Sequence, residues 1–242
     1  MKSKAFLTIL IILTLSGSPL LGMDGPENIV EPGKQTITKQ VQQSLSPQKI
    51  IELLKQGNRR FMSGKTIGHN YRREMSETAE AQYPPAIVLS CIDSRVAPEI
   101  IFDLGIGDVF DVRVAGNIVN EDIAGSMEYA TKMAGSKLVL VMGHTGCGAI
   151  KGAVDDLKLG NLTGLLAKLK PAIKTLSHSA ANRTSKNNKF VDAAALVNVK
   201  LTIDNIRRIS PVLRELEKKQ KILITGCLYD IKTGRVTFTD EN

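Results

Sequence analysis

Apolar runs and helical stripes alternate along most of the chain. Apolar or alternating runs occur at residues 86–89, 108–114, 138–142 and 222–224, and a shorter run follows at 236–238. Short apolar runs bounded by turn residues are typical of strands buried on both faces of a parallel sheet. Because helical patterns separate the runs, we expect an α/β fold. The prediction is a mainly parallel central sheet of about four to five strands, flanked by helices.

The helical patterns are clearest in three places. Ser46 is a favourable N-cap and Pro47 a favourable first helical residue, and a helical apolar stripe follows them. A helix is also predicted over about residues 189–209, and another begins at residues 210–211. One further stripe, which we expect to face the core, consists of Leu162, Leu165, Leu166, Leu169, Ile173 and Leu176.

The N-terminus has a different pattern. Lys2 and Lys4 precede an apolar run at residues 5–15, and small residues and a proline follow at 16–19. This order is typical of a secretory signal peptide, which we assign to residues 1–22. The run is shorter than the roughly 20 residues that a membrane span needs, although an uncleaved anchor stays an alternative. We therefore expect an exported protein, located in the periplasm, with no stable membrane insertion after cleavage.

The rest of the chain is expected to form one folded unit. Residues 23–45 are polar, contain two Pro/Gly pairs and are predicted to be a flexible arm. Residues 46–242 contain no internal repeat and are predicted to form a single catalytic domain. The whole chain of 242 residues is 43% hydrophobic and 23% charged, which is ordinary for a globular protein with a sizeable core.

The charge of the chain does not indicate nucleic-acid binding. The formal net charge is +8, and removal of residues 1–22, which contain two lysines and no acid, would leave it at +6. The basic residues are scattered and aromatic residues make up only 4% of the chain. Nucleic-acid binding favours clustered Lys and Arg with stacking aromatics, so we expect no nucleic-acid partner.

Two short segments carry candidate chemistry. Cys91, Asp93 and Arg95 occupy alternate positions, and His144 and Cys147 follow 53 and 56 residues after Cys91. Two thiolates and one imidazole are good zinc ligands, and three protein ligands with an open fourth position are typical of a catalytic zinc. The predicted metal ligands are Cys91, His144 and Cys147, with Asp93 as a possible fourth.

The cysteines and histidines divide into two groups. With three cysteines in the chain, Cys91 and Cys147 either form a disulfide or hold a metal, and the nearby His144 favours a metal. Cys227 lies at the end of a predicted buried strand and is expected to be a free, small apolar residue. His69 and His178 have polar neighbours and are expected at the surface.

The predicted fold brings the two segments together. Cys91 follows one buried strand and His144 follows another, and sites in parallel sheets gather at the carboxyl ends of strands. If the chain stays extended, Cys91, Asp93 and Arg95 project to the same side. Asp93 could then bind the metal and block water, or pair with Arg95 and leave the position open. A zinc-bound hydroxide would be the nucleophile, because zinc lowers the pKa of water from about 15.7 toward about 7.

Several segments of the sequence resemble the β-class carbonic anhydrases over about residues 46–240. They are SP at 46–47, GNRRF at 57–61, SCIDSRV at 90–96, FDVRVAGN at 110–117, GSMEYA at 125–130, GHTGCGA at 143–149 and YDIKTGRVTF at 229–238. The two metal-bearing segments are specific to that family when they occur together.

The resemblance implies a function and an assembly. The implied reaction is the reversible, zinc-dependent hydration of carbon dioxide to bicarbonate and a proton, with one Zn²⁺ per chain on Cys91, His144 and Cys147. Asp93 would be a fourth ligand in a closed state and would pair with Arg95 in an open state. The implied assembly is a homodimer or a dimer-based tetramer.

Three alternatives stay open from the sequence. The first is a zinc-dependent hydrolase of a related small electrophile, carbonyl sulfide or carbon disulfide. The second is a non-catalytic zinc or redox module in which Asp93 closes the metal site permanently. The third is a cysteine-dependent hydrolase or phosphatase with Cys91 as nucleophile, although the spacing to Arg95 is shorter than a phosphate-cradling cysteine loop requires.

Overall fold

A five-stranded sheet forms the centre of the molecule. The structure is a computed structural model that describes residues 35–176 and 182–239. The strands are β1 (Ala86–Ser90), β2 (Phe110–Arg113), β3 (Leu138–His144), β4 (Leu223–Tyr229) and β5 (Val236–Phe238), in the order β2-β1-β3-β4-β5. The first four strands are parallel, and β5 is antiparallel to β4. The predicted fold class and all five predicted strands are confirmed.

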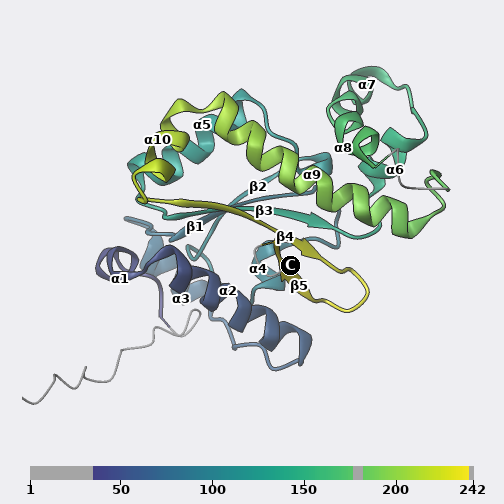
Figure 1. Cartoon of the computed structure of the whole chain (residues 1–242). Helices are drawn as coiled ribbons and strands as arrows, with labels where there is room; N and C mark the ends of the chain where they lie inside the picture. The colour runs from purple at the N-terminus through teal and green to yellow at the C-terminus, as the bar shows by residue number, and fades with distance from the viewer. Residues whose placement is uncertain (1–34, 177–181, 240–242) are drawn as a thin grey trace, which may run out of the picture.

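Helices cover both faces of this sheet (Figure 1). On one face lie α1 (Lys39–Ser44), α2 (Pro47–Met62), α3 (Tyr71–Thr78) and α4 (Pro98–Ile101), and on the other α5 (Glu121–Glu128), α9 (Asn188–Ile209) and α10 (Pro211–Lys218). The helices α6 (Gly148–Val154), α7 (Gly160–Ala167) and α8 (Lys170–Thr175) gather beyond the end of β3. Two further short helical segments of the described residues are η1 (Ala115–Asn117) and η2 (Tyr129–Met133). Among the described residues, none of the helices combines the length and the apolar character that crossing a membrane would require.

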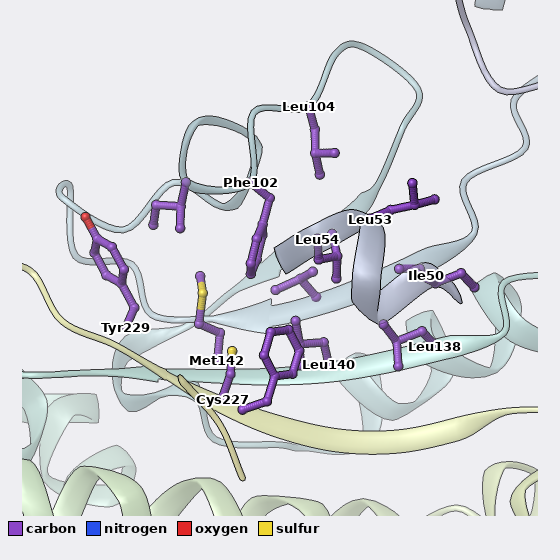
Figure 2. Packing of buried hydrophobic residues seen from close by; sticks show 14 of the residues in the cluster. Ile50, Leu53, Leu54, Phe102, Leu104, Leu138, Leu140, Met142, Cys227 and Tyr229 are labelled. Atoms are coloured by element: carbon purple, nitrogen blue, oxygen red, sulfur yellow. The ribbon is translucent and has the colours of Figure 1, made fainter. Parts of the chain in front are cut away.

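The side chains of β3 alternate between two cores. Leu138, Leu140 and Met142 pack toward α2, whereas Val139 and Val141 pack toward α9. Figure 2 shows the first of these cores, where leucines of α2 lie over β3 and Cys227 lies beside Met142. Each fully buried aliphatic side chain contributes about 1.5–3 kcal/mol to folding. Cys227 is confirmed as a free cysteine with no exposed surface.

Residues of the GNRRF segment pack helix α2 closely against its neighbours. Ser46 caps the helix by accepting a hydrogen bond from the Lys49 backbone N–H, as predicted. A Cβ at Gly57 would lie 1.7 Å from the carbonyl oxygen of Phe102, so only glycine lets α2 pack this closely. The buried Asn58 side chain donates to the carbonyl of Gly234 and accepts from the N–H of Val236, which ties α2 to β5.

Two expectations about local structure are wrong, and a third is confirmed with one refinement. Residues 39–44 of the predicted flexible arm form α1, and Gln42 of that helix donates to the carbonyls of Pro84 and Ala134. The stripe at 162–176 faces the core as predicted, but it is divided between α7 and α8, because Pro171 starts a new helix at its first turn. The side chain of His69 is only 7% exposed and lies between Glu74 and Asp103.

Some predictions fall on residues outside the described part of the chain. The signal peptide at 1–22 and the first part of the arm belong to this group, and so does His178.

The register of the sheet places the two candidate segments next to each other. Leu89 of β1 pairs with Val141 of β3, and both strands point the same way. Cys91 follows directly after β1, and His144 is the last residue of β3. Both therefore lie at the carboxyl edge of the sheet, where open α/β sheets place their sites.

Candidate metal centre

The chain turns sharply soon after β1. The Val96 N–H donates to the carbonyl of Asp93 at 2.9 Å, so Ser94 and Arg95 form a turn. The expectation of an extended chain from Cys91 to Arg95 is therefore wrong. The turn, and not strand alternation, brings the Arg95 side chain back to Asp93.

Arg113 at the end of β2 holds the chain before this turn. Its Nε donates to the carbonyl of Cys91 at 3.0 Å, and its Nη2 donates to the carbonyl of Asp93 at 2.7 Å. Sequence reasoning gave Arg113 no role. Its pairing opposite Ser90 in the sheet register is the signal that places it beside Cys91, and that register comes only with the fold.

The second segment is a strand end joined to a helix start. His144 ends β3, Thr145 and Gly146 form a turn, and Cys147 is the N-cap residue of α6. Gly146 has a φ of +65°, which a side chain would disfavour. The turn puts the His144 ring and the Cys147 thiol on the same side of the sheet edge.

Three ligand atoms meet at this edge. The ligand atoms of Cys91, His144 and Cys147, one from each residue, all lie within 4.8 Å of one another, and all three residues are buried. The Nδ1 of His144 lies 3.0 Å from the carbonyl oxygen of Thr145, which can only accept, so Nδ1 carries the proton. His144 Nε2 is left buried with no hydrogen-bond partner among the described residues. A buried, unpartnered imidazole nitrogen beside two free thiols fits a zinc ion.

The two thiols are electrostatically unequal. The hydrogen bond between the side chains of Cys147 and Cys91 lowers the pKa of Cys91 and raises the pKa of Cys147. The Gly116 N–H adds to the effect by donating to the Cys91 sulfur at 3.3 Å. This hydrogen bond therefore favours ionisation of Cys91 over ionisation of Cys147.

Asp93 is bound to Arg95 and stands apart from the cluster. The Arg95 Nε and Nη2 donate to the two Asp93 carboxylate oxygens at 2.9 and 2.7 Å, and the Arg95 N–H adds a third bond at 3.0 Å. These hydrogen bonds hold the pKa of Asp93 well below its usual range. This is the pairing expected of an open site, whereas the role of Asp93 as a fourth ligand stays a prediction.

An apolar cavity borders the cluster. It has a volume of about 270 Å³ and is lined in part by Cys91 and Asp93. Leu157, Leu162 and Leu166 also line it, together with the small residues Gly148 and Gly152 of α6. The cavity offers a small apolar molecule a place beside Cys91, one of the three residues of the cluster.

Asp111 on β2 is a second unusual carboxyl near the sheet edge. Burial, and then the nearby Glu99 carboxylate, raise its pKa to about 7, and its Oδ1 has no hydrogen-bond partner among the described residues. The folded state therefore prefers the protonated form. Ionising Asp111 in the folded protein lowers the free energy of unfolding. This loss is absent below the unfolded pKa of about 3.9 and is present in full once the pH exceeds about 7.

Replacing Asp111 by asparagine should stabilise the protein at pH 8 and not at pH 4. After a discount for solvent screening of this half-buried group, we expect a gain of about 1–2 kcal/mol in the free energy of unfolding at pH 8. Urea unfolding of both proteins between pH 4 and 8 measures it, with the exposed Asp155→Asn as control. A gain that is the same at both pH values would contradict the prediction.

Comparisons with known proteins support one family. Residues 86–236 match the family model described as carbonic anhydrase. Carbonic anhydrase 2 of Mycobacterium tuberculosis is 31% identical over 193 residues, which cover 77% of this chain and 90% of that protein. The carbonic anhydrase of Mycolicibacterium smegmatis is 33% identical over 190 residues, covering 76% of this chain and 88% of that protein.

A solved structure agrees on the fold. One of two tetrameric β-carbonic anhydrases from Sordaria macrospora has a TM-score of 0.64 and 24% identity, over 78% of this chain and 96% of that chain. The match to the family model extends from the start of β1 to the start of β5, so it includes all three buried ligand atoms and the Asp93–Arg95 pair. On this evidence the chain belongs to the β-class carbonic anhydrase family of enzymes.

Proposed function

We propose that this chain hydrates carbon dioxide reversibly to bicarbonate and a proton, with one zinc ion per chain held by Cys91, His144 and Cys147. The observation that carries the proposal is the convergence of three buried ligand atoms within 4.8 Å. An apolar cavity lined in part by Cys91 suits carbon dioxide, which is small and carries no charge. Membership of the family supports the same reaction.

Zinc at this site would supply the Lewis acidity that lowers the pKa of a water molecule and makes it a nucleophile at neutral pH. The remaining work falls to the side chains. His144 is held by the Thr145 carbonyl so that Nε2 faces the thiols, and the apolar wall of α7 keeps bulk water from one side of the cavity. The substrate carbon can then approach from the cavity.

Asp93 and Arg95 would orient the reacting water and not store its proton. Both carboxylate oxygens of Asp93 accept from Arg95, which keeps Asp93 ionised at neutral pH. A carboxylate in that state can still accept a hydrogen bond from a water beside Cys91. Because its pKa lies far below 7, it is a poor proton acceptor, and the proton leaves through solvent to buffer.

The decisive test measures carbon dioxide hydration and zinc content on the same preparation. Stopped-flow assays between pH 6 and 9 should show hydration in a protein that contains about one zinc per chain. Full activity in a metal-free preparation would refute the zinc mechanism. Zinc-loaded protein with no hydration at any pH would favour the non-catalytic zinc or redox module.

A sulfur analogue is the second candidate substrate. The cavity is lined mainly by apolar side chains and glycines, which would accept carbonyl sulfide or carbon disulfide as readily as carbon dioxide. The two functions are separated by comparing kcat/KM for carbon dioxide with the rate of sulfide release from either analogue. The Cys91 nucleophile alternative is disfavoured because the Cys91 sulfur is buried beside His144 and Cys147 and lacks a phosphate-cradling loop.

We also propose that the chain assembles into a homodimer or a dimer-based tetramer. Strand β2 is a sheet edge with one neighbour, and edge strands present unpaired backbone groups to a second chain. The Sordaria macrospora proteins are tetrameric, which supports self-association in this fold. Light scattering on the zinc-loaded protein would measure the mass, and a monomer at micromolar concentration would refute the proposal.

Export is a separate proposal and rests on residues 1–22 alone. Cell fractionation combined with N-terminal sequencing of the mature chain tests it. A full-length protein in the cytoplasm would refute it.

A further inference from the structure

Helix α9 touches both halves of the candidate zinc site through two side chains. The first is Asp192, whose Oδ1 accepts a hydrogen bond from the Gly146 N–H at 2.7 Å. Gly146 lies in the turn between His144 and Cys147, and its φ of +65° directs its backbone to this contact. The Asp192 carboxylate therefore anchors the loop that carries two of the three ligands.

The second side chain is Asn198, which acts on the third ligand through one intermediate. Its Nδ2 donates to the carbonyl of Gly116 at 2.8 Å, and Asn198 is only 3% exposed. The N–H of the same glycine donates to the Cys91 sulfur at 3.3 Å. Gly116 has a φ of +69°, and side-chain atoms of Leu169 stand 2.9 Å from where its Cβ would be, so its orientation is closely fixed.

The helix itself is firmly placed on the sheet. Val199 packs so closely on β3 and β4 that a Cβ at Gly143 or Gly226 would lie 2.6 or 2.4 Å from its methyl groups. These two glycines let α9 sit against the same strand that ends in His144. Asp192 and Asn198 are thus carried on an element whose position is set by the ligand-bearing strand.

We propose that Asp192 and Asn198 are positioning residues that hold the two ligand-bearing segments in register for zinc. Asp192 fixes the His144–Cys147 turn, and Asn198 fixes the Gly116 N–H that stabilises the Cys91 thiolate. Hydrogen bonds of this outer kind typically change metal affinity by about 10- to 100-fold. The inference rests on the zinc site of the proposed function.

The test is the rate at which zinc leaves the full-length protein. A chelator in excess is added to zinc-loaded wild type, Asp192→Ala and Asn198→Ala, and the released zinc is followed by absorbance. Each variant should release zinc about 10- to 100-fold faster than wild type. Asp192→Asn keeps an acceptor oxygen for the Gly146 N–H and should stay within about threefold of wild type.

Matched controls come from the same helix. Asp204→Ala and Asn205→Ala remove the same residue types from α9 positions that make no recorded contact with the ligand segments among the described residues. Both should release zinc at the wild-type rate. Equal rates in Asp192→Ala, Asn198→Ala and these controls would overturn the proposal.

A second measurement separates positioning from general stability. A positioning role predicts that Asp192→Ala and Asn198→Ala lower the Tm of the zinc-loaded protein more than that of the zinc-free protein. Equal decreases would indicate a purely structural role and overturn the proposal. If an alanine variant does not fold, the cobalt(II) absorption spectra of Asp192→Leu, which removes the acceptor for the Gly146 N–H, and Asn198→Asp, which removes the donor to the Gly116 carbonyl, report the same geometry. Spectra identical to wild type would overturn the proposal. A wild-type chain that binds no zinc would instead refute the proposed function.

Discussion

Replacing Cys91 by serine should remove zinc and lower kcat/KM for carbon dioxide hydration by at least about a thousandfold, because water then keeps a pKa near 15.7 instead of about 7. The Cys91 sulfur is the preferred thiolate of the pair, and it is one of only three convergent ligand atoms in the described residues. A serine hydroxyl stays protonated at neutral pH and is a poor zinc ligand. Zinc content by elemental analysis and stopped-flow hydration on the same sample measure both effects.

The control for this change is Cys227→Ala. Cys227 is also buried and free, but it lies in the core between α2 and the sheet (Figure 2), and burial raises the pKa of its thiol. Its replacement should cost about 1–2 kcal/mol of stability and leave the zinc content unchanged. A Cys91→Ser protein that keeps about one zinc per chain would contradict the assignment of Cys91 as a ligand, and a metal-free one with wild-type kcat/KM would contradict the zinc mechanism.

The strands could be predicted from sequence because their signal is local. Residues 86–89 and 138–142 are apolar at every position, and the structure buries them on both faces of a parallel sheet. The rule that sites gather at the carboxyl ends of such strands then places Cys91 and His144 together. Ser46 and Ser210 mark helix starts because an N-cap hydroxyl followed by proline is a local device as well.

The incorrect predictions concern segments whose conformation depends on a contact with residues distant in sequence or on a single residue. The extended interpretation of 91–95 ignores Arg113, which holds the carbonyls of Cys91 and Asp93 from another strand. The arm at 39–44 contains few apolar residues, and its helix is held by Gln42, which reaches carbonyls over 40 and 90 residues away in sequence. His69 has polar neighbours in sequence but is buried by Glu74 and Asp103, which fold over it.

The outer contacts of the site also escape sequence reasoning. Asp192 and Asn198 lie in the helix predicted over about residues 189–209, for which the sequence indicates no further role, and neither is a metal ligand. Their partners are the backbone groups of Gly146 and Gly116. Because every residue type has a backbone carbonyl, and all but proline a backbone N–H, the sequence does not reveal which of these groups a side chain contacts. The spacing of the ligands therefore predicts the first contacts of a metal, whereas the contacts that fix those ligands require the fold.

Replacing Arg95 by leucine should lower kcat/KM for carbon dioxide by about a hundredfold while zinc stays bound, a loss that corresponds to about 2.7 kcal/mol of transition-state stabilisation. Arg95 supplies three hydrogen bonds to Asp93, two of them from its side chain. Without the guanidinium, the Asp93 carboxylate is free to turn to the metal, two residues from Cys91, and to take the position that water needs. Stopped-flow hydration, zinc analysis and a crystal structure of the zinc-loaded variant measure these effects.

The double variant distinguishes this closure from a simple loss of charge. In Asp93→Ala/Arg95→Leu no carboxylate can block the fourth position, so the activity should recover part of the loss and exceed that of Arg95→Leu alone. Such a result is strongly non-additive, as expected for two residues that act through one contact. Arg59→Leu on α2 removes one exposed positive charge that belongs neither to the cluster nor to the cavity, and it should keep wild-type kcat/KM. If the double variant is instead less active than Arg95→Leu, Arg95 acts on the substrate directly, and the proposed exchange of Asp93 between arginine and metal is wrong.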